Sequence, residues 1–246
     1  DIMITLDISQ SMLTEDLSPN RIEAAKQVAY EFIQGRPNDN IGLTLFGGEA
    51  FTQCPMTTDH TALLSTFRGV SCELQTNGII APGTAIGMGL TNAVSRLANS
   101  KAPSKVVILL TDGANNAGDI SPLTAAEIAQ QKKVRVYTIA VGRQGMVRQP
   151  VGLLPDGSYY YANVKSDMDP NTLRDIAKAT GGLYYAAASK SELRNIYRDI
   201  DKLERTKLKQ HHYNKYYEAF APFAWAALAL LLLEVVLRLT WLRRIP

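Results

Sequence analysis

A carboxylate and two hydroxyls at alternate positions, Asp7, Ser9 and Ser11, directly follow an apolar run over residues 2–6. This run, in which Thr5 is the one polar residue, predicts a buried strand. In open α/β sheets, ligands bind in the crevice outside the carboxyl ends of the strands, and oxygen ligands suit a hard divalent cation such as Mg²⁺. Ser and Asp after a strand are also typical of a simple turn cap. This stretch alone therefore leaves both interpretations open.

Two later segments favour the metal site. The apolar run 106–110 predicts a second buried strand, which leads into Thr111 and Asp112. Between the two strands, residues 82–87 open a helical pattern in which Thr84 stands where an N-cap hydroxyl is expected. If the strands are neighbours, their ends and this helix start form one cluster of oxygen ligands, made of Asp7, Ser9, Ser11, Thr84 and Asp112.

This set, in its order and spacing, resembles the metal-ion-dependent adhesion site of von Willebrand factor type A domains. Four longer stretches, residues 19–26, 39–55, 83–87 and 109–116, are similar to the BatA-type membrane proteins of bacterial aerotolerance operons. The resemblance implies a Rossmann-like domain with bound Mg²⁺, or Mn²⁺ or Ca²⁺ in its place. It also implies that other Bat-type membrane proteins and a MoxR-class AAA+ ATPase are partners. Gln10 replaces the usual Gly of the wider superfamily, but its side chain is expected to point away from the metal.

Composition limits the class of partner. The formal net charge of the 246 residues is only +3, which is too small to indicate nucleic-acid binding. Much of the basic surplus flanks an apolar tail, where contact with anionic lipid explains it. These flanking residues are Arg205, Lys207, Lys209, Lys215, Arg238, Arg243 and Arg244. The remaining length, about 200 residues, suits one globular domain.

The tail over residues 219–237 predicts a transmembrane helix. Its roughly nineteen residues span about 29 Å as a helix, enough to cross a hydrocarbon core. It is apolar on every face, unlike most buried globular helices, and interfacial aromatics flank it at Tyr216, Tyr217, Trp225 and Trp241. Glu234, its sole acid, stands four residues before Arg238 and is expected to pair with it rather than to relay protons.

The short segment 238–246 is basic and carries no acid. It predicts a cytoplasmic tail. Together with the resemblance, this tail places the protein in the bacterial inner membrane with its domain facing the periplasm. Because the sequence starts at Asp1 inside a predicted strand, we expect that an upstream targeting or membrane segment precedes it.

Alternating periodicities predict a doubly wound, mostly parallel α/β sheet with right-handed crossovers. The expected strands are 2–6, 41–46, a short edge strand 50–52, 106–110, 134–141 and 182–186. The expected helices are 21–35, 60–67, 86–97, 122–132, 170–179 and 189 to about 208. The chain would thus comprise a domain over 1–205, a basic juxtamembrane segment 206–218, the membrane helix and the basic tail.

One segment interrupts this alternation. Residues 143–164 contain the turn signal Asp156-Gly157 and three tyrosines in a row, Tyr159, Tyr160 and Tyr161. This pattern predicts an inserted β-hairpin. The hairpin either covers a sheet edge or presents exposed aromatics to a protein partner, and exposed aromatics favour partner binding somewhat.

Cysteine and histidine offer little chemistry. Cys54 and Cys72 are too few for a disulfide framework, and each is expected to be a small buried side chain, although they could lie close together. His60, His211 and His212 follow no catalytic or metal-binding pattern.

The sequence favours a binding module over an enzyme. It has no phosphate-binding loop, and Ser9 stands where an aspartyl-phosphate mechanism would prefer a second acid. A metal held largely by neutral hydroxyls stays electrophilic and can accept an Asp or Glu carboxylate from a protein partner. Two alternatives remain: a structural membrane anchor that docks partners through the 143–164 hairpin, and a metal-dependent phosphatase.

Overall fold

The structure is a computed structural model that describes residues 1–154, 159–166, 168–204 and 220–240. The chain divides into two compact units, Asp1–Thr206 and Lys207–Pro246. The second unit contains the helix α8 (Phe220–Thr240). The predicted juxtamembrane segment 206–218 and residues 241–246 of the basic tail lie outside the described residues.

The first unit is built on a six-stranded sheet with the strand order β3-β2-β1-β4-β5-β8. Its strands are β1 (Ile2–Asp7), β2 (Ile41–Phe46), β3 (Ala50–Thr57), β4 (Val106–Thr111), β5 (Arg135–Val141) and β8 (Tyr184–Ala187). All neighbours pair in parallel except β2 and the edge strand β3. The predicted doubly wound, mostly parallel α/β fold is therefore confirmed.

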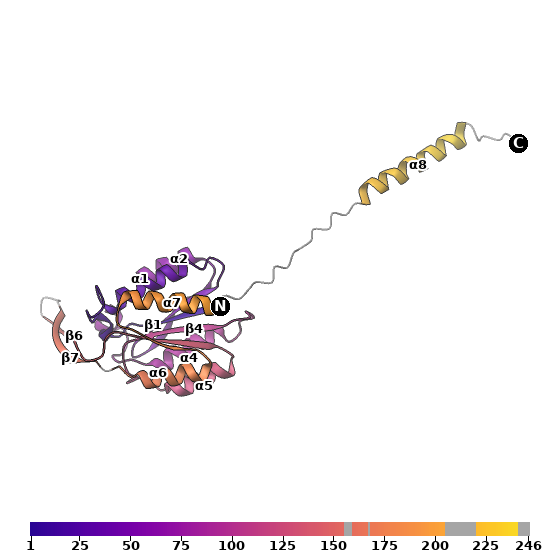
Figure 1. Cartoon of the computed structure of the whole chain (residues 1–246). Helices are drawn as coiled ribbons and strands as arrows, with labels where there is room; N and C mark the ends of the chain where they lie inside the picture. Colours follow the sequence, from indigo (N-terminus) through magenta and orange to yellow (C-terminus); the bar gives the residue numbers. More distant parts are fainter. Residues whose placement is uncertain (155–158, 167, 205–219, 241–246) are drawn as a thin grey trace. The chain divides into compact units, whose positions relative to one another are not determined.

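Helices cover both faces of this sheet (Figure 1). One face carries α1 (Arg21–Gln34), α2 (His60–Arg68) and α7 (Lys190–Glu204), and the other carries α4 (Ile86–Leu97), α5 (Pro122–Gln131) and α6 (Pro170–Thr180). Two short helical segments, η1 (Gln10–Leu13) and α3 (Glu73–Thr76), lie in the loops between these elements and were not predicted.

The central strands are apolar on both faces because both faces are covered. In β1, Ile4 and Leu6 belong to the core beneath α1 and α7, whereas Met3 belongs to the core beneath α4. All six residues of β1, and all six of β4, are buried. Since each large aliphatic side chain contributes about 1.5–3 kcal/mol when fully buried, these strands form the rigid base from which the loops at their carboxyl ends project.

Local capping explains where several helices begin. The Asn20 side chain accepts a hydrogen bond from Glu23 N (2.9 Å) at the start of α1. Asp59 accepts bonds from Thr61 N and Ala62 N at the start of α2, as its position in the sequence predicts.

Two local predictions differ from the structure. The edge strand β3 extends over Ala50–Thr57 rather than 50–52, because its pairing with β2 continues through register shifts to Thr57. The prediction that Thr84 caps α4 is wrong: the N-cap is Ala85, and no side chain caps this helix. Thr84 is instead held within the preceding loop, where its N donates to Asn116 Oδ1 (2.8 Å).

A separate two-stranded sheet follows β5. It pairs β6 (Met146–Leu153) with β7 (Tyr159–Lys165) antiparallel and confirms the inserted hairpin. The expected turn residues Asp156 and Gly157 lie outside the described part of the chain. The hairpin projects at the end of the sheet opposite the N-terminus (Figure 1).

A polar cluster joins the start of the domain to its last helix. The N-terminal amine of Asp1 donates to Ser104 O (3.0 Å), and Ser104 Oγ donates to Glu204 Oε2 (2.8 Å) at the end of α7. Tyr137 OH (2.6 Å) and the Arg135 guanidinium also donate to Glu204. The first strand and the last helix therefore meet at the amino ends of the strands, opposite the loops that follow β1 and β4.

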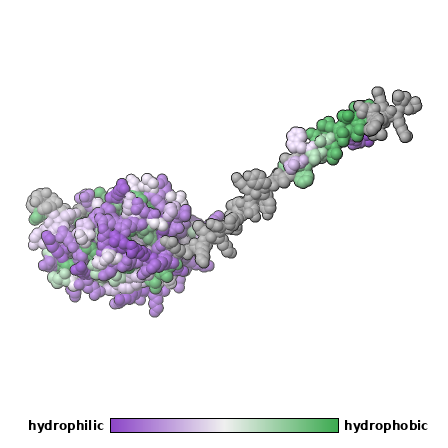
Figure 2. Space-filling view, turned by 45° about the horizontal axis from the view of Figure 1, so that its top comes forward, coloured by the Kyte–Doolittle hydropathy of each residue, from purple (hydrophilic) through white to green (hydrophobic). Residues whose placement is uncertain are grey.

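The surface of α8 differs from that of the domain. Figure 2 shows a mostly hydrophilic face on the domain and a predominantly apolar surface on α8. The segment Pro222–Leu239 is long and apolar enough to cross a membrane. Glu234 and Arg238 form the expected i,i+4 ion pair (2.8 Å).

We expect Glu204→Gln to lower the free energy of unfolding by roughly 2 kcal/mol at pH 7, because hydrogen bonds to a buried carboxylate are stronger than those to an amide. Burial raises the pKa of Glu204, but bonds from Tyr137, Ser104 and Arg135 outweigh it and leave the pKa below its usual value. A lowered pKa stabilises the fold above the unfolded value and loses that effect as the pH falls through the folded value. The difference between the wild type and the variant should therefore shrink in acid.

Urea unfolding followed by circular dichroism, at neutral and acidic pH, measures this difference. The exposed Glu127→Gln is the matched control and should change stability little. A Glu204→Gln chain as stable as the wild type at pH 7 would contradict the role assigned to this carboxylate.

Candidate metal centre

The loops after β1 and β4 bring two carboxylates together. Asp7 is the last residue of β1, and Asp112 directly follows β4. Because these strands pair in parallel with Leu6 opposite Leu110, their carboxyl ends lie side by side. Asp7 and Asp112 lie close together, as predicted, because β1 and β4 are adjacent strands.

Hydroxyl groups connect the two acids. Asp7 accepts hydrogen bonds from Ser9 N (2.8 Å) and from Thr111 Oγ1 (2.6 Å). Ser9 Oγ and Ser11 Oγ lie 2.9 Å apart, and Ser11 Oγ donates to Asp112 Oδ1 (2.7 Å). Four of the five predicted ligands therefore belong to one hydrogen-bonded network.

The fifth, Thr84, enters from the loop before α4. Its O accepts from Asn116 N (3.1 Å), and its N donates to the Asn116 side chain (2.8 Å), so two bonds tie this loop to the one after β4. A Cβ added at Gly113, the neighbour of Asp112, would lie 3.6 Å from Thr84 Oγ1. The Thr84 hydroxyl therefore lies beside the loop that carries Asp112.

Both carboxylates are buried, and within the described part of the chain only Asp112 of the two is bonded to a cation, the Arg21 guanidinium. Asp7 is 0% exposed and Asp112 2% exposed. Burial, followed by repulsion from Asp112, raises the pKa of Asp7 to about 7. Burial also raises the pKa of Asp112, although the neighbouring Arg21 guanidinium opposes this. A cation between the two acids would offset the cost of burying their charge.

The donor set fits a hard divalent ion. Two carboxylates and three hydroxyls provide oxygen ligands only, which is the preference of Mg²⁺. Among the described residues, no group of three or more His, Cys, Asp or Glu side chains could hold a metal. The hydroxyl-rich cluster is therefore the candidate site in this part of the chain.

The sequence did not single out Gln75 of α3. Its Oε1 accepts from Gln10 N (2.7 Å), between Ser9 and Ser11, and its Nε2 donates to Gly83 O (2.9 Å), directly before Thr84. Gln75 therefore links two of the three ligand loops. No local pattern could have found it, because the link depends on a 65-residue separation along the chain.

The sequence also assigns no role to Arg21, which lies in the stretch 19–26 that resembles the Bat-type proteins. It is the first residue of α1, yet its side chain is buried and donates to Asp112 Oδ2 (2.7 Å). An Arg is rarely buried unless it is paired, but the sequence gives no sign of this burial, because Arg21 begins an amphipathic helix in which a solvent-exposed Arg is equally expected.

The family model for the von Willebrand factor type A domain matches residues 1–199. The chain belongs to this family. An uncharacterised protein of Borreliella burgdorferi is 32% identical over 248 residues, which cover 100% of this chain and 70% of that protein. A UPF0353 protein of Nocardia farcinica is 29% identical over 218 residues, 81% of this chain and 62% of its own length.

Two solved structures are similar to this von Willebrand factor type A domain. The conserved hypothetical protein BatB from Bacteroides thetaiotaomicron superposes with a TM-score of 0.71 at 28% identity, over 83% of this chain and 98% of that one. An aerotolerance-related membrane protein from Bacteroides fragilis gives 0.68 at 26% identity, over 82% and 96%. The predicted similarity to Bat-type proteins is thereby confirmed.

The hairpin of this type A domain does not present three tyrosines together. Side chains alternate along β7, so Tyr160 is 56% exposed, whereas Tyr159 and Tyr161 are partly buried with ring centroids 6.5 Å apart. The Arg148 guanidinium lies 4.8 Å above the Tyr161 ring and pairs with Glu15 (3.2 Å). The expected row of exposed aromatics is therefore wrong, and Tyr160 is the exposed member.

Neither the cysteines nor the described histidine belongs to the predicted ligand set, although the Cys72 thiol lies near enough to Asp7 and Asp112 for their charges to raise its pKa. Cys54 and Cys72 are both buried and form no disulfide, and burial raises the pKa of both thiols. His60 Nε2 is 2.9 Å from Asp39 O, near the amino end of β2. His211 and His212 fall outside the described residues.

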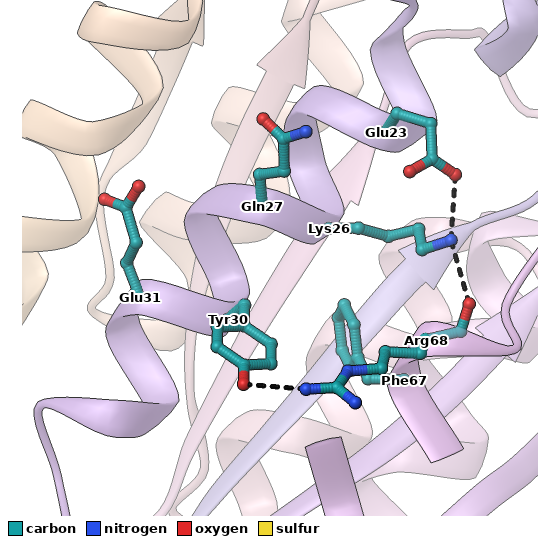
Figure 3. Close-up of a pocket in the computed structure, with 7 residues that line it drawn as sticks. All are labelled: Glu23, Lys26, Gln27, Tyr30, Glu31, Phe67 and Arg68. Carbon is teal, nitrogen blue, oxygen red and sulfur yellow. Dashed lines mark hydrogen bonds and ion pairs between the residues drawn. The ribbon is translucent and has the colours of Figure 1, made fainter. Parts of the chain in front are cut away.

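An open groove of about 410 Å³ lies between α1 and α2 (Figure 3). It is lined by Glu23, Lys26, Gln27, Tyr30, Glu31, Phe67 and Arg68. Lys26 Nζ donates to Glu23 (2.8 Å) and to Val70 O (2.7 Å), and Arg68 donates to Tyr30 OH (3.2 Å). Because these charged groups bond within the protein, the groove is not a second candidate for the metal.

We expect Asp7→Asn to have opposite effects with and without metal. Removing a buried charge should raise the stability of the metal-free protein by roughly 2 kcal/mol. The same change removes a predicted ligand and should abolish stabilisation by Mg²⁺. Thermal unfolding at pH 8 in EDTA and in Mg²⁺ tests both effects, with the exposed Asp119→Asn of the loop after β4 as control. Equal Mg²⁺ stabilisation in wild type and Asp7→Asn would contradict the ligand assignment.

Proposed function

We propose that this chain is a membrane-anchored, metal-dependent protein-binding module. The observation that supports this proposal is the cluster of Asp7, Ser9, Ser11, Thr84 and Asp112, which joins oxygen ligands from three loops at one end of the sheet. Family membership and similarity to Bat-type proteins support the same interpretation.

In the proposed mechanism, Ser9, Ser11 and Thr84 hold the ion through neutral hydroxyls, and Asp7 and Asp112 compensate its charge. The ion, Mg²⁺ with Mn²⁺ or Ca²⁺ as alternatives, supplies an electrophilic position for one further ligand. Ser11 is partly exposed, unlike the two acids, so this side of the cluster faces solvent. An Asp or Glu of a protein partner fits that position, and its charged, partly desolvated contact would anchor the interface.

The described residues supply little for a phosphatase. Such a mechanism needs a nucleophile or base and positioned cations beside the metal. Arg21 bonds to two carboxylates, and His60 bonds at the opposite end of β2. We therefore propose binding rather than catalysis.

A structural anchor remains the second candidate, favoured by the exposed side chains of the hairpin. Met146 is 69% exposed and Tyr160 56% exposed. In this alternative, partners dock on Tyr159, Tyr160 and Tyr161 without the metal.

We place the chain in the bacterial inner membrane, with residues 1–205 facing the periplasm, 206–218 beside the membrane, 219–237 across it and 238–246 as a cytoplasmic tail. The apolar surface of α8 and the membrane-protein description of the Bacteroides fragilis relative support this placement. Other Bat-type proteins and a MoxR-class AAA+ ATPase are the proposed partners, and stress or oxygen tolerance is the proposed context.

We expect co-purification of membrane partners to be lost in EDTA and to return with Mg²⁺ or Mn²⁺. Thr84→Ala should lower the yield of partners, because it removes one hydroxyl ligand. Crosslinking and pull-down of the full chain from membranes measures both effects, and the exposed Thr61→Ala of α2 is the control. Equal retention of partners in EDTA and in Thr84→Ala, with loss in Tyr160→Ser, would replace this model with the structural anchor.

The proposed orientation makes a separate prediction. A protease added to intact spheroplasts should digest the domain, because the domain is proposed to face outward. Digestion only after lysis would place the domain in the cytoplasm.

A further inference from the structure

Arg21 joins the candidate metal centre to a second acid outside the ligand set. Its NH1 donates to Asp112 Oδ2 (2.7 Å), while its Nε and NH2 donate to the two oxygens of Asp16 (2.8 and 2.7 Å). The side chain of Arg21 is 2% exposed, that of Asp112 0% and that of Asp16 7%. A guanidinium thus lies buried between two carboxylates, and one of them is a predicted metal ligand.

The surrounding backbone is shaped for this guanidinium. Gly142 has φ 125°, and a Cβ added there would lie 2.5 Å from Arg21 Cζ, so no other residue leaves room for the group. Asp16 Oδ2 also accepts from Arg143 N (2.7 Å), next to Gly142. Asp16 is therefore held by the backbone at the base of the hairpin, and it orients Arg21 through a bidentate pair.

The two carboxylate oxygens of Asp112 have different partners. Oδ2 is occupied by Arg21, and Oδ1 faces Ser11 Oγ within the ligand cluster. Only Oδ1 is thus directed at the position proposed for the metal. The charges also match: Arg21 pairs with Asp16 and Asp112, and with the nearby Asp7 the cluster holds three carboxylates and one guanidinium, so that a divalent cation would make the group neutral.

We propose that Arg21 is a positioning residue that sets the metal affinity of this site. Asp16 orients the Arg21 guanidinium and partly compensates its positive charge. Arg21 holds Asp112 in one orientation and acts as an internal cation that competes with the metal for the Asp112 charge. The metal is then bound less tightly than two free carboxylates would bind it, and it keeps more positive charge for the carboxylate of a partner. This role rests on the proposed metal-binding function.

Substitutions of Arg21 and of Asp16 should change the Mg²⁺ affinity in opposite directions. Arg21→Met removes a positive charge close to the metal, so Mg²⁺ should bind roughly tenfold more tightly. Asp16→Asn removes the negative charge that partly compensates Arg21. The guanidinium then repels Mg²⁺ more strongly, and the Mg²⁺ affinity should fall by roughly tenfold. A merely structural role would weaken binding in both variants, because each change disturbs the same loops.

Isothermal titration of the full chain in detergent with Mg²⁺ measures these affinities. Arg21→Lys keeps the positive charge but loses the planar guanidinium that forms the bidentate pair. The Mg²⁺ affinity of this variant should stay within about threefold of the wild type. Arg194→Met is the matched control: it breaks a bidentate pair with Glu31 on the surface of α7, and the Mg²⁺ affinity should not change. Thermal unfolding gives a second readout, in which Arg21→Met should be less stable than the wild type in EDTA and gain more stability from Mg²⁺.

The outcomes separate the two proposals. A wild-type chain that does not bind Mg²⁺ would overturn the metal site itself. A wild-type chain that binds Mg²⁺, with Arg21→Met and Asp16→Asn both weaker or both unchanged, would overturn the role of Arg21 and leave the metal site standing. If Arg21→Met does not fold even in Mg²⁺, Arg21→Gln, which also removes the charge, takes its place, and a Mg²⁺ affinity equal to or weaker than that of the wild type would overturn the proposal.

Discussion

The burial of negative charge at the carboxyl ends of β1 and β4 is the constraint on which the site depends. Asp7 and Asp112 are almost fully removed from water, and Arg21 is the cation bonded directly to one of them. Unpaired buried charge is costly. The hydrogen bonds from Ser9, Ser11 and Thr111 offset part of this cost, and a divalent ion is proposed to supply the rest.

The fold supports this buried charge by placing polar clusters at the two ends of an apolar core. Mostly apolar strands covered on both faces provide a rigid base, and the charged side chains of the ligand cluster and of the Glu204 cluster lie at the strand ends. At the amino ends, Glu204 ties the last helix to the sheet and to the start of the chain. At the carboxyl ends, Gln75 and Asn116 hold the ligand loops to one another. The cluster around Glu204 and the predicted ligand cluster thus lie at opposite ends of the same domain.

The hairpin lies at the binding end as well (Figure 1). Glu15 pairs with Arg148 of β6, and the adjacent Asp16 pairs with Arg21 and with the backbone of Arg143. The loop that follows Ser9 and Ser11 is therefore bonded both to the hairpin and to the metal cluster. A partner proposed to contact both surfaces would therefore meet one continuous structural unit.

The sequence by itself determined the layered α/β fold and the inserted hairpin, because hydrophobic periodicity and turn residues are local signals. It also indicated the five oxygen ligands, since strand ends carry them in order along the chain. Only the tertiary structure decided that Thr84 is a loop residue rather than a cap, that Tyr160 alone of the three tyrosines is exposed, and that Gln75 and Arg21 support the cluster. The roles of Gln75 and Arg21 depend on contacts such as Arg21 to Asp112, which are 91 residues apart, and no local pattern encodes a contact of that separation.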